Sequence, residues 1–278
     1  MIKIKQKIVS INNINFSNDS RFVLIAGPCA IESLDHAVNM TGLIKEICKK
    51  FKINFVYKSS FDKANRSSIK SERGIGLEKS LSIFQELKKI YNCSIITDVH
   101  EASQCNKVSE YVDILQIPAF LSRQTDLLIS AANTKKAVMV KKGQFAAPWD
   151  MNNIVDKLEA AKCNKILLCE RGASFGYNTL VSDMRAIPIM QKTGYPVVFD
   201  ATHSVQQPGG LGEKSGGQRE FVPTLSRAAV AVGVAGIFLE THENPENAPS
   251  DGPNMIKVSE LSFLLEKLLE IDRIIKDK

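Results

Sequence analysis

FVLIAGPCA, residues 22–30, is the stretch from which the fold can be predicted. Phe22 to Gly27 form an almost unbroken apolar run, which then gives way to proline and cysteine. A run without alternating polar residues is typical of a strand buried on both faces, as in a parallel sheet. We therefore predict a buried strand over residues 22–27, followed by a loop that contains Cys29.

Seven further runs of the same kind follow along the chain. They are Ile53 to Ser59, Ser94 to Val99, Val112 to Ile117, Ala137 to Lys141, Lys165 to Glu170, Pro196 to Ala201 and Ala235 to Glu240. Segments with helical periodicity lie between them and after the last. Examples are His36 to Phe51, Leu77 to Tyr91, Gln124 to Asn133, Asn152 to Ala161, Thr179 to Lys192 and Phe221 to Val232, and the last helix is Val258 to Lys276.

About eight βα units in 278 residues predict an α/β protein with a single (β/α)8 TIM-barrel domain over residues 1–278. The alternative is a doubly wound open sheet, but the chain lacks the glycine fingerprint of a dinucleotide-binding fold. Before the first unit, Lys3 to Ile11 and Ile14 to Phe16 flank Asn12-Asn13, a turn signal. We expect residues 1–20 to form a short N-terminal β-hairpin that caps the bottom of the barrel, or else a loose arm.

The composition is that of an ordinary globular protein, with 44% hydrophobic and 24% charged residues. No apolar run approaches the roughly 18 residues of a membrane span, and the first residues do not resemble a secretory signal. The net charge of +6 is spread along the chain, so we expect neither a nucleic-acid nor a membrane partner. The six cysteines form no CxxC pair, which is typical of free thiols in the reducing cytoplasm.

Polar side chains collect where the predicted strands end, which in a barrel is the functional face. Lys58, Lys63, Lys141 and Arg171 would lie there together, and their mutual repulsion would be offset by a multiply charged anion. The loop from Lys63 to Ser68 has the groups to bind a phosphate, although it could be an ordinary polar turn. The glycine-rich residues 215–219 could bind phosphate ahead of a helix, but we expect a lid.

A metal site is predicted from barrel closure, which brings the last strands beside the first. Cys29, His203, Glu240 and Asp251 would then meet on one side of the barrel mouth. A thiolate, an imidazole and two carboxylates suit a divalent Zn, Fe, Mn or Co ion better than Ca²⁺ or Mg²⁺. His100 and His242 are rival ligands, and the alternative is an inert thiol beside a structural histidine.

Several motifs resemble one family along essentially the whole chain. They are AGPCAIES (26–33), KSSFDKANRSS (58–68), TDVHE (97–101), QIPAFLSRQTDLL (116–128), KKGQF (141–145), ERGASFGYN (170–178), FDATHSVQ (199–206) and FLETHENPENAPSDGPNM (238–255). The family is the 3-deoxy-D-manno-octulosonate 8-phosphate synthases, also named 2-dehydro-3-deoxyphosphooctonate aldolases. KANRSS is the most specific motif, because the sister enzymes that make 3-deoxy-arabino-heptulosonate 7-phosphate carry a KPRTS-like loop there.

The resemblance implies a TIM-barrel transferase that condenses phosphoenolpyruvate with D-arabinose 5-phosphate and water. The products would be 3-deoxy-D-manno-octulosonate 8-phosphate and inorganic phosphate, for lipopolysaccharide biosynthesis. It also implies a homotetramer in the cytoplasm of a Gram-negative bacterium. Cys29 stands where metal-independent members carry asparagine, so the chain resembles the metal-dependent class.

The resemblance also implies roles for individual residues. Those that bind phosphoenolpyruvate would be Lys58, Lys63, Lys141 and Arg171, supported by Gln116 and Gln144. Those that bind the sugar phosphate would be Asn65, Arg66 and Ser67, with Arg123 from a neighbouring subunit. Asp98 and His100 would lie near the reacting carbons, and His203, Glu240 and Asp251 would complete the metal set with Cys29. Two rival functions are a Schiff-base aldolase that uses Lys58 or Lys141, and a phosphosugar-binding protein without catalysis.

Overall fold

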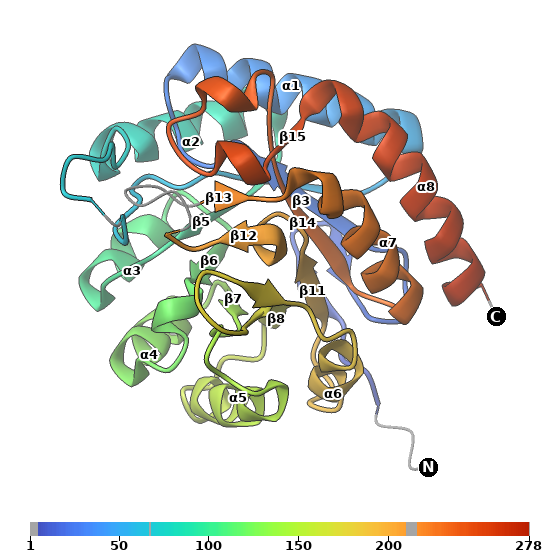
Figure 1. Cartoon of the computed structure of the whole chain (residues 1–278). Coiled ribbons are helices and arrows are strands. Elements are labelled where there is room, and N and C mark those ends of the chain that lie inside the picture. The colour runs from blue at the N-terminus through green and yellow to red at the C-terminus, as the bar shows by residue number, and fades with distance from the viewer. Residues whose placement is uncertain (1–4, 67, 210–215, 278) are drawn as a thin grey trace.

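A closed barrel of parallel strands forms the centre of the molecule (Figure 1). The computed structural model describes residues 5–66, 68–209 and 216–277. The barrel strands, in order around the ring, are β3 (Val23–Gly27), β4 (Phe55–Lys58), β5 (Ser94–Asp98), β6 (Ile114–Ile117), β7 (Ala137–Lys141), β8 (Ile166–Glu170), β11 (Val197–Asp200) and β14 (Gly236–His242). Pairing of β14 with both β11 and β3 closes the ring. The predicted TIM barrel is therefore confirmed.

The register at the closure sets the positions of the strand ends. In the pairing of β14 with β3, Leu239 lies opposite Ala26 and Glu240 lies opposite Gly27. All residues of both strands are buried, which explains the apolar sequence of β3 and of β14 up to Leu239, whereas Glu240, Thr241 and His242 are buried polar residues at the end of β14. The carboxyl ends of the first and the last barrel strand therefore lie side by side.

Helices surround the barrel as an outer layer (Figure 1). They are α1 (Leu34–Phe51), α2 (Leu77–Tyr91), α3 (Ala102–Ser109), α4 (Thr125–Asn133), α5 (Met151–Ala160), α6 (Ala186–Gln191), α7 (Val222–Val232) and α8 (Val258–Lys276). The first of these begins at a serine N-cap, because Ser33 Oγ accepts a hydrogen bond from the His36 backbone N–H at 3.1 Å. Among the described residues, no helix has the length and apolarity to cross a bilayer.

One part of the helical prediction was wrong. The helix predicted over Thr179 to Lys192 starts at Ala186, because Pro188 lacks an N–H and fits only the first turn of a helix. The residues before it form β10 (Leu180–Val181), which pairs with β9 (Ala173–Ser174). Helix α3 lies between β5 and β6, and its sequence ASQCNKVS has few apolar residues.

The remaining short strands join loops above the barrel. Strand β12 (Gln206–Gln207) pairs with β13 (Gly216–Gly217), and β15 (Ile256–Lys257) pairs in parallel with the end of β14. Part of the predicted lid, Ser215, lies outside the described residues, whereas Gly216 and Gly217 form β13.

The predicted N-terminal hairpin is present as β1 (Val9–Ile11) and β2 (Ile14–Phe16), with Asn12 in the turn at φ 52°. Its first strand begins at Val9 rather than at Lys3, which lies outside the described residues. Asn12 Nδ2 donates to Ser94 Oγ at 2.9 Å, and Asn18 Oδ1 accepts from the Val197 N–H at 2.9 Å. Ser94 and Val197 begin β5 and β11, so this segment lies against the amino ends of the barrel strands.

Gly27 provides a test of the close approach between β3 and β4. A Cβ atom on Gly27 would lie 2.0 Å from the Lys58 carbonyl oxygen, so Gly27→Ala must displace the strand that carries Lys58. We expect the free energy of unfolding to fall by about 3 kcal/mol, measured by urea denaturation. Gly236→Ala is the matched control, because its Cβ would lie 3.1 Å from Val23 O and should cost about 1 kcal/mol. Equal losses in the two variants would contradict this explanation.

Candidate active site

A cavity of about 420 Å³ opens at the carboxyl ends of the barrel strands. Its volume is within the range of small-molecule sites. Twelve of the predicted site residues line it: Lys58, Lys63, Asn65, Arg66, Asp98, His100, Gln116, Lys141, Gln144, Arg171, His203 and Asp251. Cys29 and Glu240 are buried beside it, and Ser67 lies outside the described residues.

Two of the predicted cations are buried in ion pairs at the bottom of this cavity. Lys58 Nζ lies 2.5 Å from Glu240 Oε1, and Lys141 Nζ lies 2.6 Å from Asp200 Oδ2. Such pairs offset the repulsion between neighbouring ammonium groups and the cost of removing them from water. Both ammonium groups are thereby held in place at the cavity that an anionic substrate would enter.

The pKa values follow from these pairs. Burial alone would raise the pKa of Glu240, but the ammonium groups of Lys58 and Lys63 outweigh it and hold the pKa well below its ordinary value. Burial alone would lower the pKa of Lys141, but Asp200 outweighs it, so that pKa is raised. A raised pKa argues against Lys141 as the neutral amine of a Schiff-base enzyme.

Asp98, at the end of β5, is held by two neutral groups. Ser60 Oγ and Gln116 Nε2 donate hydrogen bonds to its two carboxylate oxygens. His100 lies nearby, edge-on to Phe61, with the ring centroids 5.5 Å apart. Burial lowers the pKa of His100 more than Asp98 raises it, so its imidazole is neutral near pH 7. Asp98 and His100 therefore offer an ionised carboxylate and a neutral base at the cavity wall.

Arg171 carries hydrogen-bond donors that no neighbouring group accepts. It is 3% exposed, and its Nη1 atom is buried without a hydrogen-bond partner in the described structure. Gln144 Oε1 is a second such atom on the cavity wall. A buried guanidinium with an unpaired N–H is suited to an anionic ligand.

Arg66 lies across the barrel mouth from Arg171. It follows β4, whereas Arg171 follows β8, and these strands are four positions apart in the closed ring. Arg66 Nη1 donates to Ser250 Oγ, and its Nη2 donates to Pro249 O at 3.3 Å. The two arginines thus approach one cavity from opposite sides.

The four residues predicted to hold a metal come together. The Cys29 thiol donates to Asp251 Oδ2 at 3.0 Å, and ligand atoms of Cys29, Glu240 and Asp251 all lie within 4.8 Å of one another. His203 Nε2 lies 3.7 Å from Glu240 Oε1. Glu240 Oε2 is buried without a hydrogen-bond partner among the described groups, so it is suited to a further ligand. The donor types and their grouping fit a divalent transition-metal ion.

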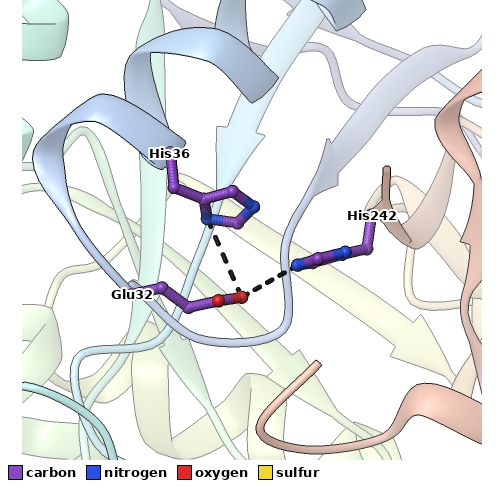
Figure 2. A group of neighbouring side chains, drawn as sticks. All are labelled: Glu32, His36 and His242. Carbon is purple, nitrogen blue, oxygen red and sulfur yellow. Dashed lines mark hydrogen bonds and ion pairs between the residues drawn. The ribbon is translucent and has the colours of Figure 1, made fainter. Parts of the chain in front are cut away.

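The rival ligand His242 belongs to a different group, with Glu32 and His36 (Figure 2). Its Nε2 lies 2.9 Å from Glu32 Oε1, and its Nδ1 accepts a hydrogen bond from the Asn244 N–H at 2.9 Å. His242 therefore lies in a second cluster of possible ligands, separate from that of Cys29, Glu240 and Asp251. His100 also lies apart, since its contacts are with Phe61 and the Gln104 side chain.

Arg123 does not line this cavity. It borders a separate hollow with Asp150 and Met151, where its carbonyl oxygen accepts a hydrogen bond from Lys157 Nζ at 3.0 Å. Its predicted role in a neighbouring subunit's site stays a prediction.

The chain matches the DAHP synthetase I family over residues 1–277. The protein belongs to this family. This member of the DAHP synthetase I family is 62% identical over 268 residues to the 2-dehydro-3-deoxyphosphooctonate aldolase of Brucella anthropi. The match covers 96% of this chain and 97% of the relative. It is 62% identical over 265 residues to the protein of that name from Agrobacterium fabrum, covering 95% of this chain and 94% of the relative.

A relative of the same name from Bartonella henselae is 61% identical over 269 residues, which is 97% of this chain and 96% of the relative. All three relatives carry the name 2-dehydro-3-deoxyphosphooctonate aldolase, which is the second name of the synthase family that the sequence motifs resemble. The resemblance is therefore confirmed.

Two polar residues of this family member were not among the predicted site residues. Asp200 Oδ2 lies 2.8 Å from His203 Nδ1, which leaves His203 Nε2 turned toward Glu240. A carboxylate that orients a histidine is a common arrangement behind metal ligands. Gln206 lines the cavity and contacts Asp251. Asp200 could have been found, because it closes a predicted strand, whereas Gln206 lies in a loop without such a signal.

Acid should destabilise this site through its carboxylates. Despite burial, neighbouring positive charges hold the pKa values of Asp98, Asp200 and Glu240 well below the ordinary value near 4. Their contribution to stability is complete above that value and is lost as the pH falls toward the lowered pKa values. We expect the free energy of unfolding to fall steeply between about pH 5 and pH 3.

The matched variants for this test are Asp200→Asn and Asp183→Asn. The first should lose about 3 kcal/mol at pH 7, because it leaves Lys141 without its partner, and should then show a shallower pH dependence. The second removes a carboxylate whose pKa is lowered by an exposed pair with Arg185, and should change stability by less than about 1 kcal/mol. If the free energy of unfolding of Asp200→Asn depended on pH as it does in the wild type, Asp200 would not contribute to the loss of stability in acid.

Proposed function

We propose that this protein condenses phosphoenolpyruvate with D-arabinose 5-phosphate and water. The products are 3-deoxy-D-manno-octulosonate 8-phosphate and inorganic phosphate, in lipopolysaccharide biosynthesis. The observation that carries this proposal is the pair of arginines, Arg66 and Arg171, on opposite sides of one cavity with paired lysines between them. That arrangement suits two phosphorylated substrates bound face to face, and the relatives' shared name supports the choice of reaction.

Substrate positioning is the main task of the cationic residues. Lys58, Lys63, Lys141 and Arg171, with Gln144, hold the carboxylate and phosphate of phosphoenolpyruvate. Asn65, Arg66 and Ser67 hold the phosphate of the sugar. With both anions fixed, the encounter of two molecules becomes a reaction between oriented groups. Gln116 acts indirectly, because its amide is hydrogen-bonded to Asp98.

The bond changes follow from this arrangement. The methylene carbon of phosphoenolpyruvate attacks the aldehyde carbon, whose oxygen gains negative charge and takes a proton. Water adds to the enol carbon, and cleavage of the carbon–oxygen bond then releases phosphate. His100 is a neutral base and Asp98 an ionised one, so they can accept the proton of that water and return it to the new hydroxyl.

A divalent ion would be held by Cys29, His203, Glu240 and Asp251. Zn, Fe, Mn and Co ions all match this mixed donor set. When bound, such an ion polarises the aldehyde oxygen or lowers the pKa of a bound water. Burial, with the charges of Asp251 and Glu240, raises the pKa of the Cys29 thiol well above its ordinary value, so this thiol must lose a proton to become a ligand.

We also propose a domain organisation, a cellular location and an oligomeric state. Residues 1–278 form a single domain, and the enzyme acts in the cytoplasm as a homotetramer. Arg123 lies away from the cavity of its own chain, which agrees with a role in the site of a neighbouring subunit. Such a role requires at least a dimer.

The reaction is tested by phosphate release with phosphoenolpyruvate and one sugar phosphate at a time. We expect release with arabinose 5-phosphate and much less with erythrose 4-phosphate. Arg171→Ala should lower kcat/KM about a hundredfold, because a charged hydrogen bond to the substrate is lost. Arg185→Ala is the control, since Arg185 is exposed and pairs with Asp183. No release with either sugar would contradict the proposal, and borohydride trapping of a substrate adduct would favour the Schiff-base aldolase.

Metal removal tests the predicted ligand set. A chelator should abolish turnover, and added divalent metal should restore it. Cys29→Ala should lower the bound metal per chain, measured by atomic emission, whereas Cys93→Ala should leave it unchanged. Cys29→Asn imitates the metal-independent class and tests whether activity survives without metal. Full activity of the metal-stripped protein would refute a catalytic role for the ion.

A further inference from the structure

Gln206 forms a bridge between two charged groups of the site. It is the first residue of β12, and its half-buried side chain lines the cavity. Its Nε2 donates to Asp251 Oδ1 at 2.9 Å, and its Oε1 accepts from Arg171 Nη2 at 2.9 Å. One carboxamide thus connects the loop after β14 with the loop after β8.

The chemistry of the two partners explains why a carboxamide is needed. The ionised Asp251 side chain only accepts hydrogen bonds, and the Arg171 guanidinium only donates them. A bridge between them must donate at one end and accept at the other, without a charge of its own. Glutamate would repel Asp251, lysine would repel Arg171, and leucine would bind neither.

Each partner has a second polar group on the side of one proposed ligand, although Asp251 Oδ2 also accepts hydrogen bonds from the Cys29 thiol and the Ser250 hydroxyl. Asp251 uses Oδ1 for Gln206, while its Oδ2 lies 3.0 Å from Cys29 Sγ in the predicted metal set. Arg171 uses Nη2 for Gln206, while its Nη1 is buried without a partner in the described part of the chain. Gln206 therefore touches the metal side and the phosphoenolpyruvate side without occupying either.

The backbone around Gln206 is fixed to the same loops. Gln206 pairs with Gly217 across β12 and β13. A Cβ atom on Gly217 would lie 1.5 Å from Asn254 Oδ1, so this strand packs closely on the turn that follows Asp251. Arg219 Nη2 also donates to Gly252 O at 2.6 Å. A displacement of Asp251 is thus transmitted to the strand that carries Gln206.

We propose that Gln206 is a positioning residue that couples metal binding to phosphoenolpyruvate binding. The inference rests on the proposed function of the site. A metal that fixes Asp251 also fixes the Gln206 carboxamide, and the carboxamide orients Arg171 toward the substrate. Such coupling is reciprocal, so phosphoenolpyruvate tightens metal binding by the same factor.

The experiment measures binding of phosphoenolpyruvate by calorimetry to metal-stripped and Mn²⁺-loaded protein. In the wild type, we expect Mn²⁺ to lower the Kd about tenfold. In Gln206→Leu, the two Kd values should become equal, and the Mn²⁺ affinity should no longer respond to phosphoenolpyruvate. Gln207→Leu is the matched control, because Gln207 is the next residue of β12 and is not among the cavity residues. It should keep the tenfold ratio.

If Gln206 had only a structural role, Gln206→Leu would weaken phosphoenolpyruvate binding with and without Mn²⁺ and leave the ratio of the two Kd values unchanged. Two results would overturn the coupling while leaving the condensation reaction in place. One is a ratio of the two Kd values in Gln206→Leu that equals the wild-type ratio. The other is equal Kd values for metal-stripped and Mn²⁺-loaded wild-type protein. If Gln206→Leu does not fold, Gln206→Glu serves instead, because it keeps the pairing with Arg171 but repels Asp251, and it too should lose the ratio. Wild-type protein that binds no phosphoenolpyruvate in either state would overturn both the coupling and the proposed function.

Discussion

The parallel pairing of β14 with β3 closes the barrel and brings the first and last parts of the site together. It sets Glu240 opposite Gly27, at the start of the loop that contains Cys29. Because side chains alternate along a strand, a shift of the register by one residue would turn Glu240 out of the barrel interior. The buried ion pair of Glu240 with Lys58, whose carbonyl oxygen approaches Gly27 closely, would then be lost. The fold and the site therefore depend on the same closure.

Charge balance explains how so many cations share one cavity. Lys58 and Lys141 each lie against a buried carboxylate, so their charges are fixed by the protein itself. Arg171 differs, because its hydrogen-bond contact is with the neutral Gln206. It therefore offers a positive charge less neutralised by direct contact than that of the lysines. Its buried Nη1, which has no partner among the described groups, is suited to an added anion.

The sequence was sufficient for the barrel and for the convergence of its strand ends. Continuous apolar runs mark strands buried on both faces, and closure then places Cys29 near Glu240 without any information about side chains. It was insufficient where the outcome depends on side-chain conformation, as in the hydrogen bond of His203 to Asp200. The few apolar residues of helix α3 give little periodicity from which to predict its bounds, and the predicted role of Arg123 depends on another chain.

Lys63 connects the metal set to the substrate set. Its Nζ lies 3.8 Å from both Glu240 Oε1 and Asp251 Oδ2. Burial alone would lower the pKa of Lys63, but the neighbouring Glu240 and Asp251 carboxylates outweigh it and raise that pKa well above its ordinary value. A divalent ion on the proposed ligands would take over much of this neutralisation. The Lys63 ammonium would then be less strongly held by the carboxylates and more available to a substrate phosphate, so the two binding sites would be linked through charge as well as through hydrogen bonds.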